Sequence, residues 1–192
     1  PDRSFVTDLD LAIELRLRAE IAARYPDHGI IGEEEGLERP DAAIRWVLDP
    51  IDGTAPFIAG VPVYATLVAL AVEGEPVIGV ADFVAAGRRF TGVRGRPTLQ
   101  NGAPCRSREA SMAGAMLACM NPDFFVDGER QALERLRDAT AWRIYGTSSL
   151  AYGLLAAGSI DLCFDTRLQV HDFACYLQII EGAGGVVTDW EG

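Results

Sequence analysis

The sequence predicts an α/β protein made of two lobes, and three features of the chain carry that prediction. A helical pattern opens the chain at residues 7–24, short strands separated by turns continue to about residue 107, and helices then alternate with strands. Strands joined by short turns are typical of an antiparallel sheet, whereas alternation is typical of an α/β layer. We therefore expect an N-terminal α+β lobe at residues 1–107 and a C-terminal α/β lobe at residues 108–192, with a cleft between them.

The first helix is expected at residues 7–24. Thr7 can cap it, and Asp8 and Asp10 lie in the first turn, where the helix dipole favours negative charge. Pro26 ends the pattern. Apolar residues recur every four positions, and we expect them to form the buried face of the helix. They are Leu9, Ile13, Leu17 and Ile21.

Apolar runs bounded by turn residues predict the strands of the first half. They are HGIIGEE (28–34), IRWVLD (44–49), VPVYATLVALAVEG (61–74), EPVIGVADFVA (75–85), RRFTGVRG (88–95) and PTLQNGAPC (97–105). The residues Glu73, Gly74 and Glu75 predict a hairpin between the third and fourth runs, and Asn101-Gly102 predicts a turn inside the last one.

The second half alternates between the two kinds of element. The expected strands are AGAMLACM (113–120), IDLCFD (160–165) and GVVTDW (185–190). The expected helices are DGERQALERLRDAT (127–140), SSLAYGLLAAG (148–158) and HDFACYLQIIEGAG (171–184). We expect Asp127 to cap the first of these helices and Gly158 to close the second.

The composition indicates a folded, acidic chain. Of its 192 residues, 49% are hydrophobic, and the formal net charge is −11. No basic run is present, which argues against a nucleic-acid partner, whereas an acidic chain suits a protein that gathers divalent cations. We find no signal peptide and no apolar run of membrane-spanning length, so we expect a cytoplasmic protein with no membrane partner. The four cysteines lack the spacing of a zinc site or a disulfide framework.

Acidic residues gather at the ends of four predicted elements. They are Asp8 and Asp10, then Glu33, Glu34 and Glu35, then Asp49 and Asp52, and finally Asp172. Taken singly, a helix start, a solvated turn or a helix cap explains three of these groups. The pair Asp49 and Asp52 differs, because an apolar strand runs directly into it.

The spacing of this pair predicts a site for metal ions and phosphate. Pro50 fixes the backbone between the two acids, and Gly53 permits close approach of a ligand. Free amides of Gly53 and Thr54 suit a phosphate if a helical turn begins there, but carboxylates repel phosphate unless cations lie between them. Oxygen ligands without Cys or His favour Mg²⁺, and two such ions can clamp a phosphoryl group and supply a nucleophilic hydroxide. The residues therefore suggest metal-dependent phosphoester hydrolysis.

Three motifs in order resemble those of a known family. I-I-G-E-E comes first, W-V-L-D-P-I-D-G-T contains the acid pair, and D-x(11)-G-G begins at Asp172. Together they resemble the inositol monophosphatase family of Mg²⁺-dependent, lithium-sensitive phosphatases, from about Ser4 to Trp190. The resemblance implies a layered αβαβα sandwich of the inositol monophosphatase and fructose-1,6-bisphosphatase type, usually a homodimer, with two or three Mg²⁺ ions in the cleft. It also implies a helix before residue 1 and a strand and helix after residue 192, so that this chain is truncated at both ends relative to the family.

The resemblance assigns roles residue by residue. The implied metal ligands are Glu33, Asp49, the backbone carbonyl of Ile51, Asp52 and Asp172. Glu34 is expected to lie behind these ligands or to help hold a third, looser ion. Thr54 and Asp10 match the pair that positions and deprotonates the attacking water, and Gly53 and Thr54 match the amides that bind phosphate. With Glu33, Asp10 and Thr54 form the catalytic set, and the implied reaction is a direct attack by metal-activated water.

The sequence leaves the substrate open between branches of the family. Residues 155–165 and 171–192 resemble the histidinol-phosphatase branch. By contrast, Gly146-Thr147-Ser148-Ser149 resembles the inositol-phosphatase pattern, and Ala55-Pro56 departs from both. Asp165, seven residues before Asp172, could bind a substrate hydroxyl or amine, or be a strand-end acid. Histidinol phosphate leads narrowly over inositol 1-phosphate and related sugar or nucleotide phosphates. A homologue that binds or regulates without turnover is the non-enzymatic alternative.

Overall fold

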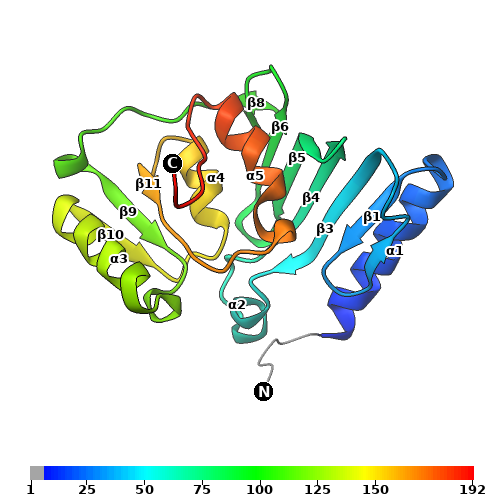
Figure 1. The fold of residues 1–192 in the computed structure, drawn as a ribbon, viewed down its shortest axis with the longest axis horizontal. Coiled ribbons are helices and arrows are strands. Elements are labelled where there is room, and N and C mark those ends of the chain that lie inside the picture. The colour runs from blue at the N-terminus through cyan, green and yellow to red at the C-terminus, as the bar shows by residue number, and fades with distance from the viewer. Residues whose placement is uncertain (1–6) are drawn as a thin grey trace.

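Five layers of helix and sheet lie side by side in the computed structural model, which describes residues 7–192 (Figure 1). Helix α1 (Asp8–Arg24) covers the outer face of an eight-stranded sheet, and α4 (Leu150–Ala156) and α5 (Val170–Gly182) lie between this sheet and a three-stranded one. Helix α3 (Asp127–Ala139) covers the far side of the smaller sheet. The predicted αβαβα order is therefore confirmed. Residues 1–6, which include the expected start of the resemblance at Ser4, lie outside the described residues.

The larger sheet has the strand order β2-β1-β3-β4-β5-β6-β7-β8. Its strands are β1 (Gly29–Gly32), β2 (Gly36–Glu38), β3 (Ile44–Asp52), β4 (Ala65–Val72), β5 (Glu75–Phe83), β6 (Arg88–Val93), β7 (Leu99–Gln100) and β8 (Ala103–Pro104). Every neighbouring pair is antiparallel except β1 and β3, which run parallel. The expected hairpin is present, since β4 and β5 pair antiparallel from Val72 and Glu75 onward. Glu73 and Gly74 between them both have positive φ, as a two-residue turn between twisted strands requires.

The smaller sheet is parallel and has the order β10-β9-β11. Its strands are β9 (Met116–Cys119), β10 (Trp142–Tyr145) and β11 (Leu162–Cys163). Strand β10 was not predicted, and the strand expected at residues 160–165 is limited to two residues. Residues 185–190 do not form the predicted strand: no partner strand pairs with them within the described chain, and Val186 is 82% exposed.

Two helix predictions need correction. Val126, and not Asp127, caps α3: Asp127 is the first helical residue, and the Glu129 carboxylate accepts the amide of Val126. In α1, Thr7 is the cap as predicted. The predicted apolar face of α1 is only partly buried, because Leu9 is 46% exposed, whereas Asp10 and Glu14 are fully buried. The most buried positions of this helix are thus two acids.

Helix α5 joins the two halves of the chain. Although it follows the smaller sheet in sequence, it packs on strands β3 to β6 of the larger one. Its backbone lies directly on Gly79 and Gly92: a Cβ atom on Gly79 would be 1.9 Å from the carbonyl oxygen of Cys175. This close approach extends the main core, which includes Phe83 and Phe90. The division into two lobes at residues 107 and 108 stays a prediction. Helix α5 belongs to the second predicted lobe but packs on the sheet of the first.

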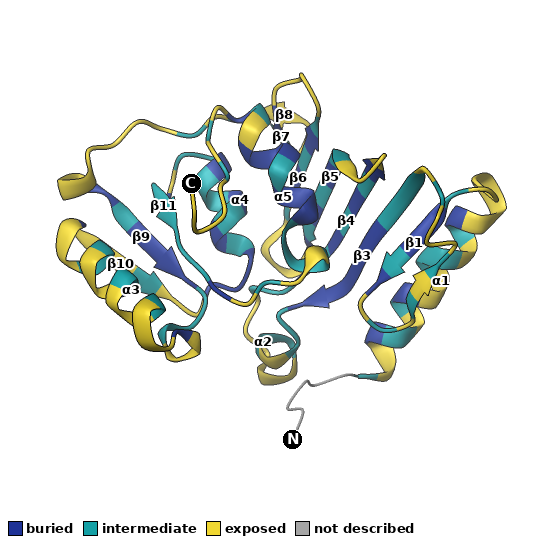
Figure 2. Ribbon diagram, viewed as in Figure 1, coloured by how far each residue is buried: buried dark blue, intermediate teal, exposed yellow. Residues whose placement is uncertain are grey.

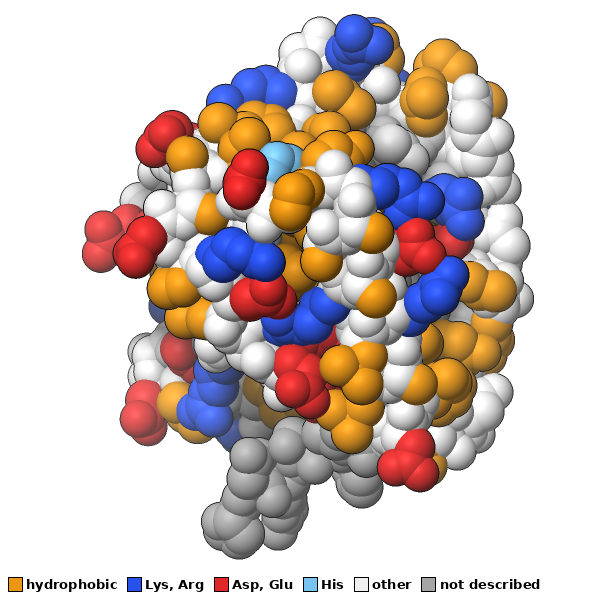
Figure 3. Space-filling model, turned by 90° about the vertical axis from the view of Figure 1, so that its right-hand side faces the viewer, with side chains coloured by type: hydrophobic (Ala, Val, Ile, Leu, Met, Phe, Trp, Pro, Cys, Tyr) orange, Lys and Arg blue, Asp and Glu red, His pale blue; other side chains and the backbone are white. Residues whose placement is uncertain are grey.

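The burial pattern separates the buried core strands from the more exposed helices and loops around them (Figure 2). The central strands β3 and β4 are largely buried, whereas the short helix α2 (Thr54–Ala59) has no buried residue. On the side of the molecule where α1 lies, acidic and basic side chains are interleaved with apolar ones (Figure 3). In α1, Arg16 and Glu20 form an ion pair of 2.6 Å. No helix within residues 7–192 has both the length and the apolar character needed to cross a membrane.

Candidate metal centre

A β-bulge turns Asp49 and Asp52 toward the same side of the sheet. Asp49 pairs with Leu67 of β4, and Asp52 pairs with Ala65, so three steps along β3 match two along β4. Side chains alternate between faces along a regular strand, and residues three apart would therefore point to opposite sides. The extra residue in the bulge brings both side chains to the same side of the sheet. Pro50, which has no N–H group, is tolerated there because the extra residue of a bulge does not pair with the neighbouring strand.

The parallel pairing of β1 with β3 brings Glu33 next to Asp49. Gly32 is in register with Leu48, and the Glu33 amide donates to the carbonyl oxygen of Leu48 at 3.1 Å. Because the carboxyl ends of parallel strands meet at one edge of a sheet, the residues that follow these two positions become neighbours. This topology explains why acids 16 positions apart in the sequence converge.

The fourth acid comes from the first turn of α5. Asp172 is the third helical residue, and its carboxylate accepts the amide of Gln169 at 2.5 Å. One ligand atom from each of Asp49, Asp52 and Asp172 lies within 4.8 Å of the others. We call Glu33, Asp49, Asp52 and Asp172 the acid cluster.

Burial raises the pKa of all four acids, and repulsion from neighbouring carboxylates adds to the shift for Glu33, Asp49 and Asp52. Loss of solvation raises the pKa of Glu33 to about 7, with smaller contributions from neighbouring carboxylates. The pKa of Asp49 lies well above its ordinary value for the same first reason, followed by repulsion from Asp52 and Glu33. Desolvation also raises the pKa values of Asp52 and Asp172. Four crowded carboxylates with raised pKa values indicate that a bound cation would stabilise the cluster.

Three donors fix one oxygen of Asp52. Ser148 Oγ donates to Asp52 Oδ2 at 2.8 Å, Ser149 N donates at 3.2 Å, and Ser149 Oγ donates to the same atom. The Tyr176 hydroxyl donates to Ser149 Oγ at 2.9 Å and so extends the network into α5. With Oδ2 occupied in this way, Oδ1 is the Asp52 oxygen left to face the cluster.

The expected water-positioning pair takes part in local contacts. Asp10 accepts the amide of Thr7 at 2.9 Å, while Thr54 Oγ1 donates to the carbonyl oxygen of Ile51 at 3.1 Å. No hydrogen bond links Thr54 to Asp10 within the described chain. Asp10 Oδ1 is buried without a partner among residues 7–192. Gly53 has φ of 81°, which favours glycine and lets the chain turn from β3 into α2.

Asp165 lies beside the smaller sheet with both oxygens engaged. It accepts the amide of Met120 and the hydroxyl of Tyr152, each at 2.6 Å. Burial raises its pKa, while these two donors oppose the shift. Its predicted contact with substrate stays a prediction. Unlike Asp165, His171 lies against the acid cluster, with Nε2 4.0 Å from Glu33 Oε1 and 3.8 Å from Asp172 Oδ1.

The donor set fits a hard divalent cation. Asp49 Oδ1 is buried and has no hydrogen-bond partner within residues 7–192, so an electron pair in the middle of the cluster is left for a ligand. The converging atoms are carboxylate oxygens, which are the ligands that Mg²⁺ prefers. The cluster can therefore bind metal, and Glu33, Asp49, Asp52 and Asp172 are the residues that would hold it.

Comparison with known proteins decides the family. A sequence profile of the inositol monophosphatase family matches residues 1–192. The chain belongs to the inositol monophosphatase family. This is a family of phosphatases that are Mg²⁺-dependent and act on small phosphate esters.

Two curated relatives and one solved structure illustrate the family relationship. The chain is 39% identical to the bifunctional phosphatase IMPL2, chloroplastic, of Arabidopsis thaliana, covering all of this chain but only 56% of that protein. It is 34% identical to the histidinol-phosphatase of Mycobacterium tuberculosis, covering 100% of this chain and 76% of the relative. An inositol monophosphatase from Zymomonas mobilis superimposes with a TM-score of 0.90 at 37% identity, covering 100% of this chain and 74% of that one. The chain thus spans about half of the plant relative and three quarters of the other two proteins.

Sequence reasoning missed several residues that shape the acid cluster. The motif that contains Ser148 and Ser149 gives no sign of their contact with Asp52, and neither Glu14 nor Tyr176 is a fixed residue of the sequence motifs. The i, i+4 spacing of Asp10 and Glu14 was an available signal, because it places two acids on one face of a helix. Nothing in the sequence near Tyr176 indicates its contact with Ser149.

Proposed function

We propose that this protein is a Mg²⁺-dependent phosphomonoesterase that hydrolyses a small-molecule phosphate ester, with histidinol phosphate as its substrate. The convergence of Asp49, Asp52 and Asp172 within 4.8 Å, with Asp49 Oδ1 unpartnered within residues 7–192, carries the metal part of the proposal. The acid cluster would hold two Mg²⁺ ions, and Glu34 would help to hold a third. The Ile51 carbonyl is proposed as a further ligand.

When bound, Mg²⁺ supplies charge neutralisation on the phosphate oxygens and a lowered pKa for coordinated water. The remaining work falls to the chain. The amides of Gly53 and Thr54, at the turn into α2, would bind the phosphate. Asp10 would accept a proton from the attacking water through Oδ1, which has no hydrogen-bond partner within residues 7–192. Thr54 would orient the same water. Glu33 is the third residue of the proposed catalytic set, beside Asp10 and Thr54.

Histidinol phosphate is proposed first because its amine can pair with a carboxylate. Asp165 is the proposed partner: the Met120 amide and the Tyr152 hydroxyl that donate to it are neutral, and no cation within residues 7–192 forms an ion pair with it. The histidinol-phosphatase relative at 34% identity supports this choice. Inositol 1-phosphate, or a related sugar or nucleotide phosphate, is the alternative, and the structural similarity to the Zymomonas mobilis enzyme supports it. A binding homologue without turnover is the non-enzymatic alternative.

A substrate panel tests this assignment. Phosphate release would be measured with Mg²⁺ on histidinol phosphate, inositol 1-phosphate and a nucleotide monophosphate, for the wild type and Asp165→Asn. We expect kcat/KM for histidinol phosphate to be at least about 10-fold higher than for the others, and Asp165→Asn to reduce that preference. Faster turnover of inositol 1-phosphate would instead establish the alternative. Folded protein that releases no phosphate from any ester would support the non-enzymatic homologue.

We further propose a cytoplasmic homodimer that lithium inhibits, as the family resemblance implies. Light scattering on the purified protein tests the dimer, and a titration of phosphate release with LiCl tests the inhibition. A monomer mass, or activity that is unchanged by lithium, would contradict the corresponding proposal.

A further inference from the structure

We propose that Glu14 is a positioning residue for the metal centre. From the middle of α1 it holds the backbone of the turn that carries Glu33 and Glu34, and so sets where these two carboxylates point. The inference rests on the proposed function, because it assigns to Glu14 an effect on divalent-cation binding by its neighbours.

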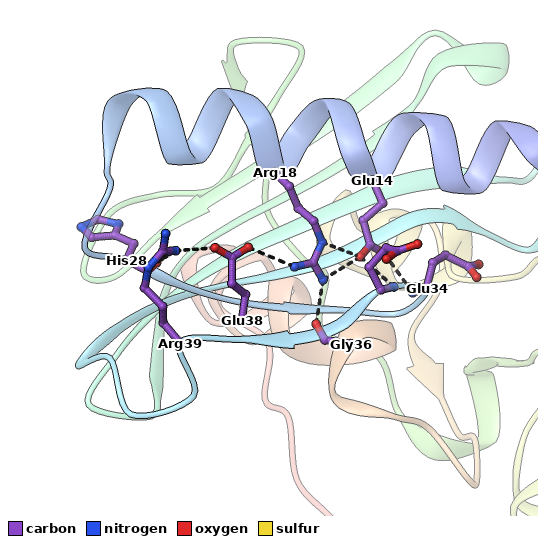
Figure 4. A network of polar contacts seen from close by, with 8 residues as sticks. Glu14, Arg18, His28, Glu34, Gly36, Glu38 and Arg39 are labelled. Atoms are coloured by element: carbon purple, nitrogen blue, oxygen red, sulfur yellow. Dashed lines mark hydrogen bonds and ion pairs between the residues drawn. The ribbon is translucent and has the colours of Figure 1, made fainter.

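Both carboxylate oxygens of Glu14 bind the backbone of this turn (Figure 4). Its side chain is fully buried, Oε2 accepts the amide of Glu34 at 2.9 Å, and Oε1 accepts the amide of Glu35 at 3.1 Å. Each oxygen thus binds one of two consecutive amides. The amide of Glu33 is held separately by the carbonyl oxygen of Leu48 at 3.1 Å. The backbone on both sides of the Glu33 side chain is therefore fixed.

Arg18 compensates the buried charge and extends the clamp. Its Nε and Nη2 lie 2.9 and 2.8 Å from Glu14 Oε1, and Nη2 also donates to the carbonyl oxygen of Gly36 at 2.7 Å. Helix α1 thus binds the turn at two places, through Glu14 at the amides of Glu34 and Glu35 and through Arg18 at the carbonyl oxygen of Gly36 (Figure 4). Gly32 makes room for this arrangement, since a Cβ there would lie 2.0 Å from Glu14 Oε1. The glycine of the G-E-E motif is needed for Glu14 to reach the amides.

The energetics favour a positioning role over a purely stabilising one. A buried ion pair adds little net stability by itself, because the loss of solvation offsets the attraction between the charges. The turn, however, carries Glu33, Glu34 and Glu35 in succession, and their like charges repel one another. The hydrogen bonds that the amides of Glu34 and Glu35 donate to Glu14 hold the turn in one conformation against that repulsion. Asp10 lies one helical turn earlier on the same buried face, so a displaced α1 would move it as well.

Mn²⁺ binding to the metal-free protein tests the proposal without relying on turnover. The free Mn²⁺ signal would be followed by electron paramagnetic resonance for the wild type, Glu14→Gln and Glu20→Gln. Glu14→Gln keeps the side-chain shape but removes one acceptor oxygen. Glu20→Gln makes the same chemical change on the exposed face of α1, where Glu20 pairs with Arg16. We expect at least 5-fold weaker Mn²⁺ binding for Glu14→Gln and wild-type binding for Glu20→Gln.

A second variant covers the case in which Glu14→Gln does not fold. Arg18→Lys keeps the positive charge but loses the fork that joins Glu14 to Gly36, and we expect it to weaken Mn²⁺ binding 2- to 5-fold. In steady-state assays, both variants should raise the Mg²⁺ concentration for half-maximal rate more than they lower kcat at saturating Mg²⁺. Wild-type Mn²⁺ affinity in the folded variants would overturn the role of Glu14. Absence of Mn²⁺ binding by the wild type would overturn the proposed function itself and this inference with it.

Discussion

Ser148 Oγ lies 2.8 Å from Asp52 Oδ2 and donates a hydrogen bond to it, although 96 positions separate the two residues in the chain. Ser148 has φ of 49°, a conformation that is uncommon for residues other than glycine. A strained residue whose side chain binds a candidate metal ligand indicates that the loop before α4 is built around Asp52.

Removal of this donor should weaken metal binding. In Ser148→Ala, Asp52 Oδ2 loses one of three donors, at a cost of about 1 kcal/mol or about 5-fold in the Mg²⁺ concentration for half-maximal rate. The Mg²⁺ dependence of phosphate release measures this effect, with the exposed Ser159→Ala as the control. An unchanged Mg²⁺ dependence in Ser148→Ala would show that Ser149 alone suffices to orient Asp52.

A methyl group between α5 and the sheet should be strongly destabilising. Gly79→Ala would place a Cβ 1.9 Å from a backbone oxygen of α5, which cannot move without shifting the helix that carries Asp172. We expect a loss of about 3 kcal/mol in the free energy of unfolding, measured by urea denaturation. Gly128→Ala is the matched control, because its Cβ would meet open space at the start of α3 and should stabilise by about 0.5 kcal/mol. Equal stabilities of the two variants would contradict the packing described for α5.

Asp161 should make stability depend on pH in the acid range. Its carboxylate accepts two bonds from Arg108, at 2.6 and 2.8 Å, and these hold its pKa below the ordinary value of 3.8. A lowered pKa in the folded state gives stability that is present above pH 3.8 and is lost as the pH falls through the folded value. We expect Asp161→Asn to have a lower Tm than the wild type at pH 7, with the difference shrinking below about pH 4. A Tm difference that stays constant down to pH 3 would exclude this linkage.

Asp49→Asn should have opposite effects with and without metal. The substitution removes one of several repelling, desolvated carboxylates, so the metal-free variant should have a Tm equal to or above that of the wild type. Mg²⁺ at 100 times its Kd should stabilise the wild type by about 2.7 kcal/mol and the variant by much less. Differential scanning calorimetry in EDTA and in Mg²⁺ measures both effects. Equal stabilisation of both proteins by Mg²⁺ would place the metal elsewhere.

Local patterns in the sequence predicted much of the fold. Thr7 as a cap, the Glu73-Gly74 turn and Gly158 at the end of α4 are decided by residues close together in the chain, and each has the predicted place. Strand β10 is hard to predict because Trp142–Tyr145 is only four residues long and three of its four residues are exposed. The strand expected at residues 185–190 has no partner within the described chain, and pairing is what forms a strand.

In the candidate site, too, neighbouring residues predict only the features that depend on local sequence. The DPIDGT spacing predicted that Asp49 and Asp52 act together, but the bulge that aligns them depends on the register with β4. The burial of Glu14 does not follow from the apolar spacing of α1, which points to Leu9 and its neighbours; the i, i+4 spacing only places Glu14 on one face with Asp10. The donors on Asp52 come from a loop almost 100 residues away, and only the packed structure brings them together.

The dependence of phosphate release on Mg²⁺ and on Asp49 tests the central claim most directly. Purified protein would be assayed with Mg²⁺, after removal of metal with EDTA, and after Mg²⁺ is restored, alongside folded Asp49→Asn. We expect turnover with Mg²⁺, its loss in EDTA, its recovery on restoring Mg²⁺, and a rate reduced by about 10³-fold or more in Asp49→Asn. Turnover that persists in EDTA, or an Asp49→Asn variant as active as the wild type, would contradict the assignment of the acid cluster as the metal centre.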